Sequence, residues 1–178
     1  MPDIAAFDPE RQLLALHRNG LRYVLIGAVA ARLQGFPRMT ARLDITPARD
    51  ADNLEKLAGA LRKLDARVYT ESVPEGLPFD WSPKALGQTT MWKLTTIGGR
   101  LDVVFEPAGT GGFADLIGSA VRFHIFGAAV DVASLEDIIR SKKAADRPQD
   151  RQDVVILQEI VRRQHLAQAA EYPTHAPE

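Results

Sequence analysis

The sequence has no cysteine, which excludes a disulfide framework, a thiol nucleophile and a thiolate metal site. It has no apolar run near the ~18 residues that a membrane span needs, and its first residues lack a signal-peptide pattern. It also lacks a basic excess, because 22 Lys and Arg residues against 23 Asp and Glu give a formal net charge of -1. These absences predict a soluble, cytoplasmic protein without membrane contact, in which any nucleic-acid contact uses a local patch.

Length and patterning predict a single domain of the α/β (α+β) class. A chain of 178 residues is long enough to bury one sizeable core. The apolar spacing alternates between the periods of helices and strands, which predicts a mixed β-sheet with flanking helices and a C-terminal helical pair. The pattern is lost after His165, so we expect the domain to cover residues 1–166 and residues 167–178 to form a flexible tail.

Capping residues and periodicity give the expected elements. Asp8-Pro9 begins a helix that stops at Asn19-Gly20, and Ser134 begins another with the form of a capping box. Residues 71–88 are rich in proline and glycine and should be irregular, with Trp81 as their anchor. The remaining expected helices are 28–33, 50–64 and 150–165, and the expected strands are 23–26, 42–46, 67–69, 90–96, 100–105, 121–126 and 129–132.

Basic side chains gather near the start of the C-terminal helices. The cluster consists of Arg140, Lys142, Lys143, Arg147 and Arg151, with Arg162 and Arg163 further along. Two interpretations remain open for it: a solvated helix face, or a patch for phosphate or nucleic acid.

Four segments together carry a more specific pattern. They are the strand-Gly-helix entry 23–31, the segment 35–45, the strand segment 101–104 and the segment 139–153. In this order they resemble the nucleotidyltransferase-superfamily toxins of the AbiEii/AbiGii type, which belong to bacterial toxin–antitoxin systems and include the MenT group. The similarity covers about residues 20 to 160.

This resemblance implies a toxin that transfers nucleotides from a nucleoside triphosphate (NTP) to the 3′ end of tRNA, with Mg²⁺ as cofactor and a cognate antitoxin as partner. Such chemistry suits two divalent ions held ~3.5 to 4 Å apart by carboxylates. By resemblance, Asp44, Asp102 and Lys142 are the catalytic residues, and Asp44 and Asp102 are also the metal ligands. The implied nucleotide-binding residues are Gly27, Ala28, Arg38, Thr40, Lys142, Arg147 and Asp150.

Position 42 departs from the family pattern. Thr-x-Asp-x-Asp here reads Thr40-Ala41-Arg42-Leu43-Asp44, and the period of two places Arg42 and Asp44 on one face of a strand. A guanidinium cannot ligate Mg²⁺. We therefore expect Mg²⁺ binding to be weak or lost, and Arg42 to pair with Asp44 or Asp102 or to reach a phosphate directly.

Several explanations of Arg42 stay open at this point. The chain is a natural non-catalytic relative, an engineered inactive variant, or an enzyme that works with one metal and an arginine clamp. The main alternative to a weakened or inactive transferase is a non-catalytic nucleotide-, RNA- or antitoxin-binding protein on the same fold. A kinase-like or adenylylating activity toward a protein uses the same metal and phosphate chemistry and is a further alternative.

Overall fold

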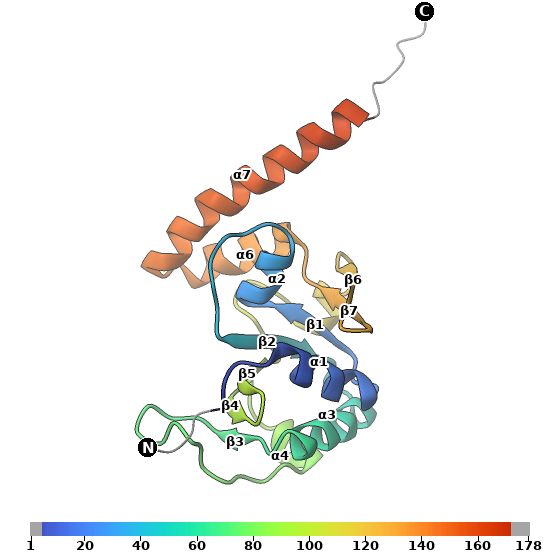
Figure 1. Ribbon diagram of the computed structural model, residues 1–178, viewed down its shortest axis with the longest axis vertical. Helices are drawn as coiled ribbons and strands as arrows, with labels where there is room; N and C mark the ends of the chain where they lie inside the picture. Colours follow the sequence, from blue (N-terminus) through green and yellow to red (C-terminus); the bar gives the residue numbers. More distant parts are fainter. Residues whose placement is uncertain (1–4, 172–178) are drawn as a thin grey trace, which may run out of the picture.

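A single mixed sheet of seven strands organises the computed structural model, which describes residues 5–171 (Figure 1). The strand order is β3-β4-β5-β2-β1-β7-β6. The mixed sheet and flanking helices confirm the predicted fold class. The strands are β1 (Tyr23–Ile26), β2 (Arg42–Pro47), β3 (Arg67–Val68), β4 (Met91–Thr96), β5 (Gly99–Val104), β6 (Val121–Ile125) and β7 (Ala128–Val132).

Two helices begin after the capping residues that the sequence indicates, Asp8 and Ser134, and a third begins after Asp50. The side chains of Asp8, Asp50 and Ser134 each accept a hydrogen bond from a backbone N–H in the first turn of the helix that follows. The helices are α1 (Pro9–Arg18), α2 (Gly27–Leu33), α3 (Ala51–Lys63), α4 (Pro83–Leu86), α5 (Phe113–Leu116), α6 (Leu135–Ala145) and α7 (Pro148–Glu171).

Helix α7 differs from its expected bounds at both ends. It begins at Pro148, which fits the first turn of a helix because that position needs no intrahelical N–H donor. It then continues past His165 to Glu171, and its last part projects away from the rest of the chain (Figure 1). No helix within residues 5–171 is both long and apolar enough to cross a bilayer.

The predicted irregular segment contains one short helix, α4, and is anchored as expected. The indole N–H of Trp81 donates to the carbonyl oxygen of Ala66 at 2.8 Å. Phe79 packs between Trp81 and Trp92, with ring centroids 6.2 and 5.0 Å away. Aromatic contacts therefore hold a segment whose backbone forms few regular hydrogen bonds.

The register of the central strands determines which side chains lie on each face of the sheet. Strand β2 pairs with β1 in antiparallel and with β5 in parallel orientation, and Asp44 lies directly opposite Asp102. Leu43 and Leu101 are likewise paired. Because neighbouring side chains on a strand point to opposite faces, the leucines and the aspartates lie on different faces of the sheet.

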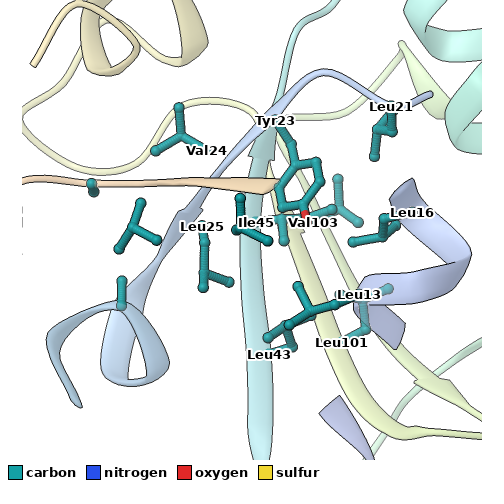
Figure 2. Packing of buried hydrophobic residues seen from close by; sticks show 14 of the residues in the cluster. Leu13, Leu16, Leu21, Tyr23, Val24, Leu25, Leu43, Ile45, Leu101 and Val103 are labelled. Carbon is teal, nitrogen blue, oxygen red and sulfur yellow. The ribbon is translucent and has the colours of Figure 1, made fainter. Parts of the chain in front are cut away.

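The apolar face of the central strands packs on α1. Figure 2 shows Leu43 and Leu101 close to Leu13 of α1, with Ile45 and Leu16 in the same cluster, and all five side chains are buried. This core fixes β2 and β5 from one side, so the opposite face carries its aspartates at defined positions.

Replacement of Leu43 by alanine should lower the free energy of unfolding by about 2–5 kcal/mol, because Leu43 is fully buried and the truncation leaves a cavity. Urea denaturation of both proteins measures the difference. Val155→Ala on the exposed side of α7 is the control and should change it by no more than about 0.5 kcal/mol. Equal losses for the two variants would contradict the proposed core.

Candidate functional site

A cavity of about 970 Å³ lies on the aspartate face of the sheet. Its walls come from the β1–α2 junction, β2, β5, α6 and the start of α7. Nine of the sequence-predicted site residues line it: Gly27, Ala28, Arg38, Arg42, Asp44, Asp102, Lys142, Arg147 and Asp150. Thr40 is not among the lining residues, and its hydroxyl contacts the backbone of Arg42 instead.

Arg42 lies between the two central aspartates. Its Nε atom donates a hydrogen bond to Oδ1 of Asp44 at 2.8 Å and is 3.3 Å from Oδ2 of Asp102. The pairing predicted from the strand period therefore involves both carboxylates. On its other side, Asp102 is 3.5 Å from Nη2 of Arg100. Two guanidinium groups thus compensate two buried carboxylates.

Gly27 makes room for the Asp44 carboxylate because it has no side chain. Its φ angle is +70°, and a Cβ atom there would lie 2.7 Å from Oδ2 of Asp44. Any other residue would be strained in the backbone and would push the Asp44 carboxylate away. The sequence predicts a role for Gly27 in phosphate binding; in this geometry its first effect is to make room for Asp44.

A second ion-pair network joins α6, α7 and the loop before β2. Nζ of Lys142 is 2.8 Å from Oδ2 of Asp153 and 3.1 Å from Oδ1 of Asp150. Arg38 approaches Asp153 at 2.6 Å, and Arg147 approaches Asp150 at 2.6 Å. The two aspartates therefore set the positions of three basic side chains.

In both networks the carboxylates are buried and the basic groups face outward. The side chains of Asp44, Asp102, Asp150 and Asp153 are 8%, 1%, 3% and 2% exposed. The basic side chains are more accessible: Arg38 37%, Arg42 46%, Lys142 18% and Arg147 73%. A molecule in the cavity meets cations first, with the aspartates behind them.

These residues do not fit the expected Mg²⁺ site. Magnesium requires oxygen ligands at about 2.0–2.1 Å in octahedral geometry, and the position between Asp44 and Asp102 is taken by Arg42. Within residues 5–171, no three or more His, Asp or Glu side chains are grouped to bind a metal. The other two carboxylates of the cavity, Glu106 and Asp137, pair with Arg49 and Arg140, respectively.

Burial dominates the ionisation of the central pair. It raises the pKa of Asp44 to about 6, although Arg42 acts in the opposite direction. Burial also raises the pKa of Asp102 against the lowering effects of Arg42 and Arg100. At Asp150 burial again disfavours the charge, but hydrogen bonds from Arg147 and Lys142 outweigh it and lower the pKa.

The basic cluster is largely paired with acidic residues of its own helices and of α5. Arg140 contacts Asp115 and Asp137, and Arg151 contacts Asp146. On α7, Arg162 and Arg163 share Glu159. These contacts favour the interpretation of the outer cluster as a solvated helix surface, whereas Lys142 and Arg147 line the cavity.

Sequence reasoning missed two residues of the site, Asp153 and Arg100. Asp153 could have been found, because Asp150 and Asp153 are three residues apart and share one face of a helix. Arg100 could have been found from the period of a strand, because Arg100 and Asp102 are two residues apart on β5 and share one face.

The raised pKa of Asp44 makes stability depend on pH. Between about pH 4, where the unfolded carboxyl ionises, and about pH 6, where the folded one does, only the folded state retains the proton. The contribution of Asp44 to stability therefore falls as the pH rises through this range. Asp44→Asn removes the effect, so the free energy of unfolding of the variant relative to wild type should rise by about 2 kcal/mol from pH 4 to pH 7.

Urea denaturation at a series of pH values measures this difference. Asp52→Asn, at an exposed position of α3, is the control, and its difference from wild type should stay nearly flat. A flat difference for Asp44→Asn would show that Asp44 does not titrate in this range.

No protein-family model and no curated protein matches the sequence. Among solved structures, the chain is similar to the lincosamide antibiotic adenylyltransferase LnuA in its lincomycin-bound crystal structure. The TM-score is 0.56 at 13% identity, over 87% of this chain and 99% of that one. The solution structure of the antibiotic-resistance factor ANT(2'')-Ia matches with a TM-score of 0.47 at 20% identity, over 94% and 96% of the two chains. The likeness to LnuA shows the fold alone, and on that basis this chain has a nucleotidyltransferase-like fold.

Proposed function

We propose that the chain binds the phosphate groups of an NTP in this cavity, and that Arg42 leaves it weakened or inactive as a nucleotidyltransferase. The observation that carries the proposal is the outward position of Arg38, Arg42, Lys142 and Arg147 over buried aspartates. Charge-assisted hydrogen bonds to phosphate are strong, and arginine forms them in bidentate geometry. Aspartates behind the cations keep each basic group in place before the ligand arrives.

The volume and the apolar lining of the cavity are also consistent with an NTP. A volume of about 970 Å³ lies at the upper end of the usual range for small-molecule sites, about 300–1,000 Å³. Apolar side chains complete the lining beside the ionic networks, and a nucleobase could lie against them. They are Ile26, Phe36, Val104, Leu116 and Ile138.

The transfer step is where Arg42 has its main effect. Transfer to a 3′ hydroxyl forms a bond from that oxygen to the α-phosphorus and releases pyrophosphate, so negative charge must be stabilised on attacking and leaving oxygens. A guanidinium contributes a single fixed charge and cannot ligate or activate an oxygen nucleophile. Binding is therefore retained while transfer is slow or absent.

The toxin role, a tRNA acceptor and a cognate antitoxin extend this proposal. They rest on the resemblance of the four motif segments to AbiEii/AbiGii-type toxins. The likeness to LnuA supports only the fold on which such a toxin would be built. In the non-catalytic alternative, which the paired Arg42 favours, the same cavity binds the nucleotide as a ligand.

Arg147 and Arg151 offer a matched pair of variants for the binding proposal. Both are exposed, and each pairs with one aspartate, but only Arg147 lines the cavity. Arg147→Ala should weaken NTP binding about tenfold, the effect of losing one charge-assisted contact of about 1.4 kcal/mol. Arg151→Ala should leave it unchanged.

Isothermal titration calorimetry with each of the four nucleoside triphosphates measures both affinities. Equal affinities for wild type and the two variants would mean that the phosphates do not bind at this wall of the cavity.

The transferase proposal is tested by restoring the family residue. Arg42→Asp should tighten binding of the magnesium–nucleotide complex and increase transfer of labelled nucleotide to tRNA by at least about tenfold, because the carboxylate can ligate Mg²⁺. Arg42→Asp combined with Asp102→Asn is the control and should lose the gain. Labelling is followed on gels, with RNA and protein acceptors side by side.

If Arg42→Asp labels no RNA with any of the four triphosphates, the tRNA transferase proposal is wrong. Label that appears on the protein acceptor alone would identify protein adenylylation as the activity of this site.

A further inference from the structure

We infer that the cavity binds its triphosphate without a divalent metal ion, because the guanidinium of Arg42 occupies the cation position between Asp44 and Asp102. This inference rests on the proposed nucleotide binding and specifies the chemical form of the ligand, a metal-free triphosphate. It also assigns Arg42 a role in binding rather than treating it only as a lost metal ligand.

The geometry around Arg42 is the first support. Asp44 and Asp102 are in register on neighbouring parallel strands. A cation placed between them neutralises both, and Nε of Arg42 is 2.8 Å from one carboxylate and 3.3 Å from the other. Since the Arg42 side chain is 46% exposed and lines the cavity, the guanidinium can keep these contacts and still reach a ligand phosphate through its outer nitrogens.

The surroundings of the other carboxylate oxygens restrict the approach of an ion. Oδ2 of Asp44 lies against Gly27, where a Cβ atom would be only 2.7 Å away. Oδ1 of Asp102 faces Arg100 at 3.5 Å, and Arg100 is held in turn by stacking on Tyr69 with its Cζ 3.3 Å from the ring centroid. Neither oxygen of Asp102 accepts a hydrogen bond, yet both are sealed from solvent, so an ion has no open oxygen of Asp102 to approach.

Charge balance leads to the same conclusion. When both are ionised, Asp44 and Asp102 carry two negative charges, which balance the two positive charges of Arg42 and Arg100. A metal dication entering this group would have to displace Arg42 and would then repel it at short range. The other four carboxylates of the cavity are each paired with a basic side chain as well. Each of the six carboxylates that line the cavity therefore already has a basic partner.

The consequence for the ligand follows from its own charge. Magnesium bound to a triphosphate in solution neutralises part of the negative charge and covers phosphate oxygens. The four basic groups of the cavity, Arg38, Arg42, Lys142 and Arg147, would then have fewer oxygens to contact. Magnesium should therefore compete with this protein for the triphosphate, the opposite of its effect in a two-metal transferase.

The first experiment is calorimetry of the wild-type chain with ATP, GTP, CTP and UTP, once in excess EDTA and once in excess magnesium. The affinity for the triphosphate should be about tenfold higher in EDTA than in magnesium. This difference corresponds to about one additional charge-assisted contact between the protein and a phosphate oxygen. Binding that requires magnesium would overturn the inference. Absence of binding in both buffers would instead overturn the proposed function.

A second experiment tests the metal position without nucleotide. Free Mn²⁺ gives an electron paramagnetic resonance signal that decreases on binding to protein, and wild type should leave it unchanged. Arg42→Asp should bind Mn²⁺ and reduce the signal. Arg163→Asp makes the same charge change on the exposed part of α7, outside the cavity, and should behave like wild type.

Arg42→Asp places a third carboxylate beside Asp44 and Asp102, and the repulsion can prevent folding. Arg42→Gln is the second variant for that case. It removes the guanidinium while adding no negative charge, and it should also bind Mn²⁺, more weakly. Mn²⁺ bound by wild type, or by neither folded Arg42 variant, would show that Arg42 does not stand in place of a metal.

Discussion

Two buried aspartates on adjacent strands, Asp44 and Asp102, impose the constraint on which the site depends. The β2–β5 register makes them neighbours on one face of the sheet, and burial of two like charges is costly unless a cation lies between them. Arg42 supplies that cation. Gly27 and Arg100 complete the group, one by leaving space for Asp44 and the other by pairing with Asp102.

Much of the fold could be predicted from the sequence because its local signals agree with its packing. The caps at Asp8 and Ser134 lie where their patterns indicated, and β4 to β7 lie within one residue of the expected strands. The end of α7 was harder to predict, because residues 164–171 are exposed and show no apolar stripe. Their alanine and glutamine content favours helix through intrinsic propensity alone, and a search for amphipathic periodicity does not detect this.

In the site, only contacts within one element could be predicted from the sequence. Arg42 and Asp44 could be paired from the period of a strand, since that geometry is local. The contact of Arg38 with Asp153 spans 115 positions, and the acidic partners that neutralise the outer arginines lie on separate turns or on α5. Such partners depend on how the helices pack, so a cluster of basic residues in the sequence does not reveal whether their side chains are already paired with carboxylates.

Arg42 separates three effects that a metal ion usually supplies together. A divalent ion compensates buried carboxylates, contacts phosphate and also positions the attacking and leaving oxygens. A guanidinium between Asp44 and Asp102 provides the first of these effects, provides the second in the proposed binding mode, and does not provide the third. It is also covalently attached, so its charge does not depend on metal concentration. In the proposed binding mode, one arginine therefore compensates the aspartate pair and contacts phosphate, while the two-metal route to nucleotidyl transfer is closed.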